Sequence, residues 1–314
     1  MRAVTIRDEQ LSVEDHPDPE PGSGEALVRV RAAGLNGADM MQRAGGYPAP
    51  PGAPADIPGL ELAGEIVALG PGADRFAVGD RVMSIVGGGG QAELATVNER
   101  ILMPVPDDLG FVEAGAAPEV FTTAHDAVFT QAGLQTGERL LVHGAAGGVG
   151  TAAVQLGRAA GARVTATVRR AELRDGVAAL GAEVIAPEGF GEHGPFDVIL
   201  ELVGVINLIE NLRSLEIGGR IAVIGTGAGA TGEINLGLLM GKRARIHGST
   251  LRPRPLESKA LTARAFERSV LPLLVSGAVH VPIAETFGLE DAVAAYDRFA
   301  AGGNLGNIVL EMPQ

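Results

Sequence analysis

A glycine-rich turn in the middle of the chain constrains its fold more than any other feature. Residues 140–151 read Leu-Leu-Val-His-Gly-Ala-Ala-Gly-Gly-Val-Gly-Thr, an apolar run that leads through four glycines into a helical pattern at Thr151 to Ala160. Glycines at such a turn let the chain bend sharply, let backbone N–H groups approach a pyrophosphate, and let the helix pack closely on the sheet. The unpaired N–H groups that begin the helix also suit a diphosphate.

We therefore predict that a dinucleotide binds at this turn. An ordinary glycine-rich strand-to-helix turn remains the alternative, because Ala145 stands where the six-residue fingerprint usually has its first glycine. The residues expected to contact the dinucleotide here are Gly144, Ala145, Ala146, Gly147, Gly148, Val149 and Gly150.

Length and composition exclude several classes of protein. A chain of 314 residues is long enough for two domains with large cores. The absence of cysteine excludes disulfides, thiol nucleophiles and Cys-ligated zinc. A net charge of −13 argues against sequence-independent binding to nucleic acid. No run reaches the roughly 18 apolar residues of a membrane span, and the first residues lack an apolar signal region, so we expect a cytoplasmic protein without membrane contact.

The first third of the chain is predicted to be rich in β-strands. Residues 25–32 read Glu-Ala-Leu-Val-Arg-Val-Arg-Ala, which is the alternation of a half-buried strand. Residues 47–54 contain four prolines and predict an irregular loop, either a rigid surface loop or one that lines a site. Together these segments indicate a small, irregular barrel-like domain. The other strands expected here are Ala3–Ile6, Leu11–Val13, Gly64–Ala68, Asp80–Ile85 and Glu93–Val97.

The middle of the chain alternates strands with helices, which predicts a parallel, doubly wound sheet. One crossover departs from this pattern, because Pro187–Pro195 is too rich in glycine and proline for a helix and is expected to be a bare loop. His143 ends a buried strand and is expected to be a core residue. The expected strands are Arg139–His143, Arg163–Val168, Glu183–Ile185, Asp197–Leu202, Arg220–Ile224 and Arg245–Ser249, and the helices are Val112–Thr130, Thr151–Ala160, Ala171–Leu180 and Leu208–Leu215.

The last segment most economically completes the first domain. Glu257–Val275 is predicted to be one amphipathic helix with a kink at Pro272. Short strands at Val279–Ala284 and Ile308–Leu310 flank a helix over Leu289–Ala301, which Gly302 and Gly303 end. The apolar side of the long helix is expected to contain Leu261, Phe266, Val270, Leu273 and Leu274.

Short motifs spread over nearly the whole chain resemble the medium-chain dehydrogenase/reductase superfamily. They are Gly34-Leu35-Asn36-Gly37-Ala38-Asp39, Gly59-Leu60-Glu61, Gly79-Asp80-Arg81-Val82, Pro118-Glu119, Gly147-Gly148-Val149-Gly150 and the run Gly87–Gly90. The chain looks most similar to the zinc-free quinone oxidoreductases, especially the p53-inducible type. This resemblance implies a GroES-like β-rich catalytic domain over 1–118 and 256–314, and a Rossmann domain that binds NADPH over 119–255.

The positions at which zinc members of this superfamily hold their metal carry other residues here. Those members have Cys, His and commonly Cys where this chain has Asn36, Leu60 and Glu119. A catalytic zinc needs three protein ligands with N, S or O donors, and one carboxylate cannot replace them. We therefore predict a zinc-free enzyme, which favours activated acceptors such as quinones or enones over simple alcohols.

Two arginines indicate which nicotinamide cofactor binds. An acidic residue about 20 residues beyond the glycines selects NAD, whereas an arginine accommodates the 2′-phosphate of NADP, and Arg169 and Arg170 stand at this distance. We therefore predict NADPH; alternatively, both arginines are the solvated start of a helix, paired with Glu172 or Asp175. The resemblance implies further cofactor contacts, each of which could be an ordinary loop or cap residue, at Thr123, Val203, Gly204, Gly225, Thr226, Gly227, Ser249, Thr250 and Asn304.

The catalytic candidates are Tyr47, Asn36 and Asp39. Tyr47 could donate a hydrogen bond to the acceptor oxygen, Asn36 could orient substrate or ribose, and Asp39 could simply hold the loop. The main hypothesis is an NADPH-dependent reductase of quinones or related conjugated carbonyls. One alternative is an enoyl-thioester reductase with Arg252 and Arg254 near the carrier phosphate, and another is a non-enzymatic NADPH-binding protein with a structural or redox-sensing role. Relatives also suggest a homodimer through the strand Ile246–Leu251.

Overall fold

The computed structural model describes residues 1–313 and divides the chain into two compact units. The discontinuous unit combines residues 1–122 with residues from 251 onward, and the central unit comprises residues 123–250. The boundaries predicted at 118/119 and 255/256 lie close to these divisions. Among the described residues, no helix is both long and apolar enough to cross a membrane.

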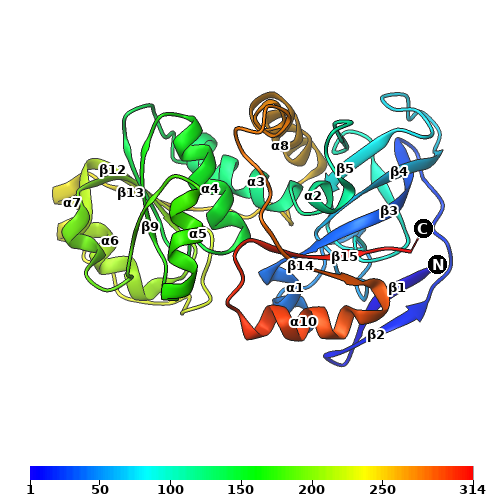
Figure 1. The fold of residues 1–314 in the computed structure, drawn as a ribbon, viewed down its shortest axis with the longest axis horizontal. Helices are drawn as coiled ribbons and strands as arrows, with labels where there is room; N and C mark the ends of the chain where they lie inside the picture. Colours follow the sequence, from blue (N-terminus) through cyan, green and yellow to red (C-terminus); the bar gives the residue numbers. More distant parts are fainter. Residues whose placement is uncertain (314) are drawn as a thin grey trace. The chain divides into compact units, whose positions relative to one another are not determined.

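The central unit is a doubly wound parallel sheet, as predicted. Its six strands follow the order β10-β9-β8-β11-β12-β13, and every neighbouring pair is parallel. Helices α4 and α5 lie on one side of the strands and α6 and α7 on the other (Figure 1). The strands are β8 (Arg139–Val142), β9 (Arg163–Thr167), β10 (Glu183–Ile185), β11 (Phe196–Glu201), β12 (Leu215–Val223) and β13 (Arg245–Gly248). The helices are α4 (Gly148–Ala159), α5 (Arg174–Ala179), α6 (Leu208–Ser214) and α7 (Leu236–Lys242).

The helix after β8 begins three residues earlier than the sequence predicted, at Gly148 instead of Thr151. Gly147 is extended and serves as the N-cap, and its carbonyl accepts the first helical hydrogen bond from the Thr151 N–H at 2.9 Å. The glycine-rich stretch therefore forms both the chain reversal after β8 and the first turn of helix α4. The first N–H groups of α4 come from Gly148, Val149 and Gly150.

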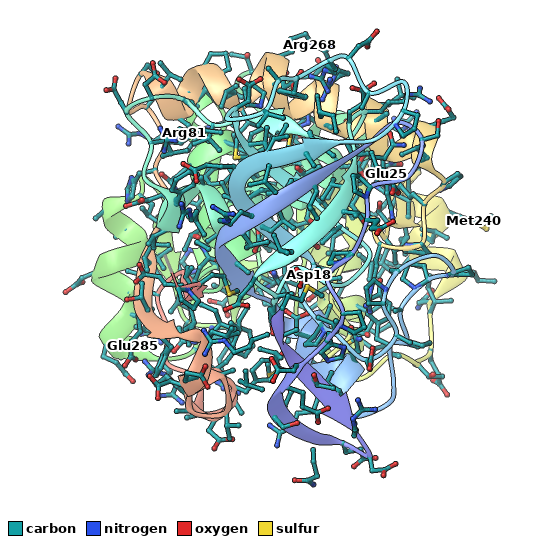
Figure 2. All side chains as sticks on the ribbon, turned by 90° about the vertical axis from the view of Figure 1, so that its right-hand side faces the viewer. Asp18, Glu25, Arg81, Met240, Arg268 and Glu285 are labelled. Carbon is teal, nitrogen blue, oxygen red and sulfur yellow. The ribbon has the colours of Figure 1, made fainter. Side chains whose placement is uncertain are left out.

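The discontinuous unit is built on an antiparallel sheet with the order β14-β15-β3-β4-β5-β7, in which only β14 and β15 run parallel. Strand β6 pairs with β3, and β1 and β2, which contain the strands predicted at Ala3–Ile6 and Leu11–Val13, pair as an antiparallel hairpin. The charged side chains of Asp18 and Glu285, both labelled in Figure 2, are exposed on its surface. Its strands are β1 (Arg2–Arg7), β2 (Gln10–Asp15), β3 (Glu25–Leu35), β4 (Glu61–Leu69), β5 (Arg81–Ile85), β6 (Leu94–Asn98), β7 (Met103–Pro104), β14 (Ile283–Gly288) and β15 (Asn307–Glu311).

Short helices complete the discontinuous unit, and the C-terminal segment supplies the two strands that extend the β3 edge. The side chain of Tyr296 is fully buried and joins the core cluster of β3, β4 and β15. Positive φ angles at Gly302 and Gly303 end the last helix, as expected. The helices are α1 (Gly37–Arg43), α2 (Phe111–Gly115), α3 (Pro118–His125, which continues into the central unit), α8 (Leu256–Ser269), α9 (Leu271–Val275) and α10 (Ala292–Ala301).

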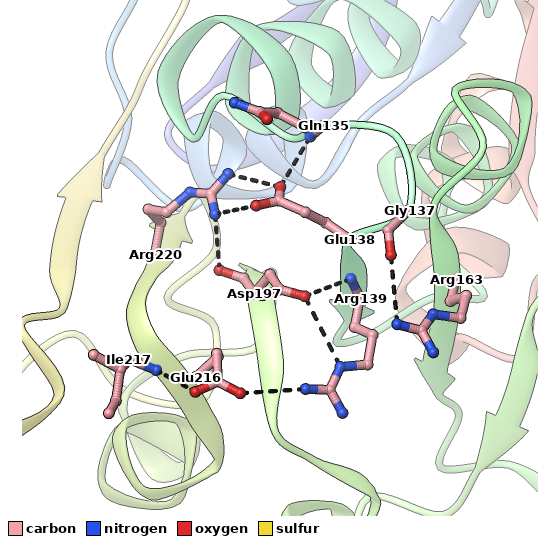
Figure 3. Close-up of polar contacts among 9 residues, drawn as sticks. All are labelled: Gln135, Gly137, Glu138, Arg139, Arg163, Asp197, Glu216, Ile217 and Arg220. Carbon is pink, nitrogen blue, oxygen red and sulfur yellow. Dashed lines mark hydrogen bonds and ion pairs between the residues drawn. The ribbon is translucent and has the colours of Figure 1, made fainter.

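Charged side chains close the amino-terminal edge of the parallel sheet (Figure 3). The Arg220 guanidinium makes two hydrogen bonds of 2.8 Å to the Glu138 carboxylate, and the Asp197 carboxylate accepts from the Arg139 N–H at 2.8 Å. Arg163 donates to the Gly137 carbonyl at 3.5 Å. These contacts occupy the amino ends of the strands, and open parallel sheets bind their ligands at the opposite, carboxyl edge.

Two predicted helices are interrupted. The single helix expected over Val112–Thr130 is three segments, α2, α3 and a π-helical turn at Asp126–Gln131, because Pro118 starts a new helix and disfavours helical backbone in the residue before it. The helix expected over Glu257–Val275 breaks at Val270 rather than at Pro272. A proline has no N–H for the carbonyl four residues earlier, so the break falls upstream of its ring.

Other expectations need smaller corrections. Leu261 is 71% exposed and does not lie on the apolar side of α8, whereas Phe266 is fully buried. The strand expected over Val279–Ala284 is Ile283–Gly288 instead. The bare loop expected at Pro187–Pro195 contains a short 3-10 turn, because Phe190 is buried in the core of the central unit and folds the loop inward. Helices α1 and α7 were not predicted.

Candidate functional site

The carboxyl edge of the central sheet collects most of the predicted cofactor residues. The glycine-rich turn follows β8, Arg169 and Arg170 follow β9, and Val203 and Gly204 follow β11. Gly225, Thr226 and Gly227 follow β12. The Ala145 N–H donates to the Thr167 carbonyl at 3.2 Å, which ties the glycine-rich turn to the end of β9.

The geometry of the turn fits a pyrophosphate. Gly144 has a φ of +63°, which favours glycine and reverses the chain. A Cβ on Gly150 would lie 2.6 Å from the Ala145 Cα, so only glycine lets α4 pack this closely. A Cβ on Gly147 would meet only the Gly144 carbonyl oxygen, at 3.8 Å. Gly147 therefore borders open space beside the N–H groups of α4, where a ligand backbone could approach.

The two arginines after β9 are both exposed. Arg170 lies 3.9 Å from Glu172, the pairing that the sequence left open as an alternative. An exposed pair of this kind contributes at most about 1 kcal/mol and does not prevent the guanidinium from binding a phosphate. Arg174 donates to the Val168 carbonyl at 3.1 Å and so holds the turn that carries the arginine pair.

The remaining predicted contacts are more scattered. The Ser249 hydroxyl donates to the Asp126 carboxylate at 3.0 Å within the central unit, and Thr123 is buried near the start of that unit. Thr250 is exposed. Asn304 belongs to the discontinuous unit, where its side-chain carbonyl accepts a hydrogen bond of 2.5 Å from Arg298.

In the discontinuous unit, Asn36 and Asp39 form the capping box of helix α1. The Asp39 carboxylate accepts from the backbone N–H of Asn36 at 2.9 Å and of Gly59 at 3.1 Å. Burial raises the pKa of Asp39 to about 6, against the lowering effect of those two hydrogen bonds. Asp39 therefore joins the start of α1 to the segment before β4 and holds the loop.

Glu61 lies directly behind Asn36 and was not among the predicted site residues. Its carboxylate accepts from Asn36 Nδ2 at 2.8 Å and from the Glu119 backbone N–H at 2.8 Å. The side chain is fully buried, and this burial raises its pKa to about 8, helped by the negative charges of Glu119 and Asp39. A carboxylate that begins an apolar strand, in Gly59-Leu60-Glu61, was the available signal.

Arg252 fixes the predicted catalytic tyrosine. The guanidinium donates to the Tyr47 carbonyl at 2.7 Å, to the Gly87 carbonyl at 2.8 Å and to Gln42 Oε1 at 2.5 Å, and lies 5.0 Å from the centre of the Tyr47 ring. Arg252 is 4% exposed. Its donors serve the proline-rich loop and neighbouring segments, so Arg252 does not present its charge to an external carrier phosphate, contrary to the role suggested for it.

The side chains at the positions where zinc members of the superfamily hold their metal do not fit zinc. Asn36 uses its amide to hold Glu61, Leu60 has no donor atom, and only Glu119 offers a carboxylate. Over residues 1–313, no group of three or more His, Asp or Glu side chains is arranged to hold a metal ion. The central unit, a parallel sheet with an open glycine-rich turn, is typical of a dinucleotide-binding protein, and the discontinuous unit carries Asn36 and Tyr47 without a set of zinc ligands.

Known proteins share this organisation. Residues 22–107 match the alcohol dehydrogenase GroES-like domain, and residues 148–266 match the zinc-binding dehydrogenase family. The chain is 32% identical to human quinone oxidoreductase over 305 residues, which cover 93% of this chain and 90% of that protein. It is also 34% identical to the spectinabilin polyketide synthase system protein NorB of Streptomyces orinoci, with 95% of this chain matched to 14% of that much longer protein.

Solved structures agree with the sequence comparisons. A quinone oxidoreductase from Pseudomonas syringae superimposes with a TM-score of 0.86 at 28% identity, covering 99% of both chains. A mycobacterial protein complexed with NADPH has a TM-score of 0.88 at 28% identity and covers 99% of this chain and 100% of its own. The chain belongs to the medium-chain dehydrogenase/reductase superfamily and is an oxidoreductase of its quinone oxidoreductase-like branch.

The buried carboxyl of Glu61 predicts a pH-dependent stability. Its pKa rises from 4.5 to about 8 on folding, so between these values the folded state binds more protons than the unfolded state. The free energy of unfolding therefore falls as the pH rises through this window. In urea unfolding, the stability of the wild-type protein minus that of Glu61→Gln should decrease from about pH 5 to about pH 8.

Subtracting the variant cancels the contributions of the titrating groups that do not interact with Glu61. A stability difference that stays constant across the window would contradict a protonated Glu61 in the folded protein.

Proposed function

We propose that the protein is a zinc-independent, NADPH-dependent reductase that transfers hydride to quinones or related conjugated carbonyls. The observation that carries this proposal is the open turn at Gly144–Gly150 with the arginine pair, rather than an acid, at the end of the next strand. The family likeness to quinone oxidoreductases and to a protein complexed with NADPH supports it.

In this proposal the central unit holds the cofactor. The N–H groups of Gly148 and Val149 face the pyrophosphate, and the Arg169 and Arg170 guanidinium groups bind the 2′-phosphate through paired, charge-assisted hydrogen bonds. The turns at Val203–Gly204 and Gly225–Gly227 border the nicotinamide half, with Thr123, Ser249, Thr250 and Asn304 as further contacts. The nicotinamide ring supplies the hydride.

The discontinuous unit supplies the acceptor side of the reaction. Burial raises the pKa of the Tyr47 hydroxyl, which keeps it protonated as a donor to the acceptor oxygen. Arg252 holds the loop of Tyr47 in place. Asn36, whose Nδ2 donates to Glu61, orients the substrate or the ribose. Asp39 positions Asn36 through the start of α1, and solvent provides the proton that completes the reduction.

The strongest alternative is an enoyl-thioester reductase. The likeness to NorB and to other polyketide synthase proteins over nearly the whole chain favours it. Both reactions reduce a conjugated carbonyl with hydride from a nicotinamide cofactor, so they differ in the acceptor that the proline-rich loop admits. The third hypothesis is a non-enzymatic protein that binds NADPH in a redox-sensing or structural role.

Oxidation of NADPH against a panel of quinones, simple enones and enoyl thioesters tests the proposal. We expect turnover with quinones or simple enones, and slower or no turnover with enoyl thioesters. Preferred turnover of enoyl thioesters would replace the proposal by the reductase alternative. Binding of NADPH without turnover of any acceptor would contradict an enzymatic function.

Replacing both arginines tests the choice of cofactor. Arg169→Ala combined with Arg170→Ala should raise the KM for NADPH roughly tenfold to a hundredfold. Each charge-assisted contact with the 2′-phosphate is worth about 1.5–3 kcal/mol, and in the variant water hydrates the phosphate and replaces part of that energy. The KM for NADH should change little. Steady-state kinetics with both cofactors measure this effect.

Arg163→Ala is the matched control, because Arg163 is exposed at the opposite end of the same strand. An equal loss with NADPH and NADH in the double variant would show that the arginines do not recognise the 2′-phosphate.

We also propose a homodimer through the β13 edge. Strand β13 is the last in the sheet order, and α7, which precedes it in the chain, exposes Leu236 by 61% and Met240 by 75%. Figure 2 shows Met240 at the edge of its view. An uncovered strand edge pairs readily with a second copy. The strand ends at Gly248, so the edge predicted over Ile246–Leu251 is shorter than expected, and Leu251 is buried.

Light scattering at micromolar concentration should give the mass of a dimer. Met240→Glu should shift the mass toward the monomer, because it places a charge on the apolar surface beside β13. Val78→Glu is the control, since Val78 is 62% exposed and belongs to the discontinuous unit rather than to the sheet that contains β13. A monomeric wild-type protein would contradict this assembly.

A further inference from the structure

Glu201 is a buried carboxylate at the carboxyl end of β11 to which no role has yet been given. The residue is 3% exposed. Its Oε1 accepts from the backbone N–H groups of Val203 at 2.7 Å and Gly204 at 2.9 Å. Its Oε2 accepts from Asn211 Nδ2 at 2.8 Å, and Asn207 Nδ2 lies 3.1 Å from the same oxygen. Four N–H donors thus converge on one carboxylate.

The backbone of Glu201 holds a second turn. Its carbonyl accepts from the N–H groups of Ile224 at 2.9 Å and Gly225 at 3.1 Å. A Cβ on Gly225 would lie 2.1 Å from the Leu202 carbonyl oxygen, so the two turns touch through their backbones. Glu201 therefore fixes both turns that border the nicotinamide half in the proposed function.

A buried chain extends from Glu201 to the other two cofactor turns. Asn211 Oδ1 lies 2.8 Å from His143 Nε2, and His143 Nδ1 lies 3.0 Å from the Thr167 hydroxyl. His143 directly precedes the glycine-rich turn, and Thr167 ends the strand that leads to Arg169. His143 is thus more than the core residue that the sequence suggested: it joins the ends of β8, β9 and β11.

The charge of Glu201 sets the direction of every hydrogen bond in this chain. A carboxylate only accepts, so Asn211 turns its Nδ2 toward Glu201 and its Oδ1 toward His143. The Nε2 of His143 must then donate. Burial lowers the pKa of His143 and keeps the ring neutral, so its Nδ1 accepts from the Thr167 hydroxyl.

We propose that Glu201 is a positioning residue that holds the cofactor-binding turns in their binding geometry, and that Asn211, His143 and Thr167 extend its influence to the arginine pair. This inference rests on the proposed function for the identity of the ligand. Its structural part, the anchoring of the Val203–Gly204 turn, does not.

Two substitutions at Glu201 separate anchoring from charge. Glu201→Met keeps the length of the side chain but leaves the N–H groups of Val203 and Gly204 without an acceptor. Glu201→Gln keeps an acceptor oxygen for both, and its amide N–H₂ can donate to Asn211 if the chain reverses. His143 would then carry its proton on Nδ1 rather than on Nε2. Glu210→Met is the control, on the partly exposed face of the same helix as Asn211.

The Kd for NADPH should rise roughly tenfold in Glu201→Met, because an unpaired buried donor costs about as much as a tenfold loss of affinity. The KM for the acceptor should stay unchanged. Glu201→Gln should restore most of the affinity, and Glu210→Met should bind as the wild type does. If Glu201 only stabilised the fold, Glu201→Met would lower the melting temperature without raising the Kd for NADPH while the KM for the acceptor stays unchanged.

Amide hydrogen exchange at Val203 and Gly204 tests the anchoring without any ligand. Exchange should be faster in Glu201→Met and near the wild-type rate in Glu201→Gln, and the imidazole NMR signals of His143 should report the switched tautomer in the latter. A folded Glu201→Met with wild-type exchange and wild-type Kd would overturn the proposal. Failure of the wild-type protein to bind any nicotinamide nucleotide would refute the proposed function, while exchange would still decide whether Glu201 holds the turn.

Discussion

The close contact between helix α4 and the end of β8 is the constraint on which the central unit depends. No atom larger than hydrogen fits on the Gly150 Cα, because a Cβ would lie 2.6 Å from Ala145 and 2.7 Å from the Gly144 carbonyl oxygen. This contact brings the N-terminus of α4 to the carboxyl edge of the sheet. The turns after β9, β11 and β12 end at the same edge, and ion pairs occupy the opposite one.

Buried carboxylates organise the loops of both units. Asp39, Glu61 and Glu201 are each at most 3% exposed, and the partners that hold them are mainly backbone or amide N–H groups rather than cations. Charge-assisted hydrogen bonds offset much of the cost of burying the carboxylate, and they fix the loop whose N–H groups point toward it. Where these bonds do not fully compensate, as at Glu61, burial shifts the group toward its protonated form.

The scaffold of a zinc-binding dehydrogenase is here retained without zinc ligands. The family models match residues 22–107 and 148–266, and Asn36, Leu60 and Glu119 stand where the resemblance places the metal ligands of the zinc members. The Asn36 amide binds Glu61 instead, and Arg252 holds Tyr47 against the proline-rich loop. These side chains therefore form hydrogen bonds within the protein in place of metal coordination.

The sequence alone determined the features that depend on local backbone preference. Period-2 and strand-helix patterns predicted the two architectures, the glycines predicted the turn at Gly144, and the motifs predicted the superfamily. Only the tertiary structure decided the start of α4 at Gly148, the break at Val270, the exposure of Leu261, and the roles of Glu61 and Glu201. These depend on contacts between segments distant in the chain, such as Glu61 with Asn36 and Glu119 or Glu201 with Ile224, and a local pattern carries no information about such partners.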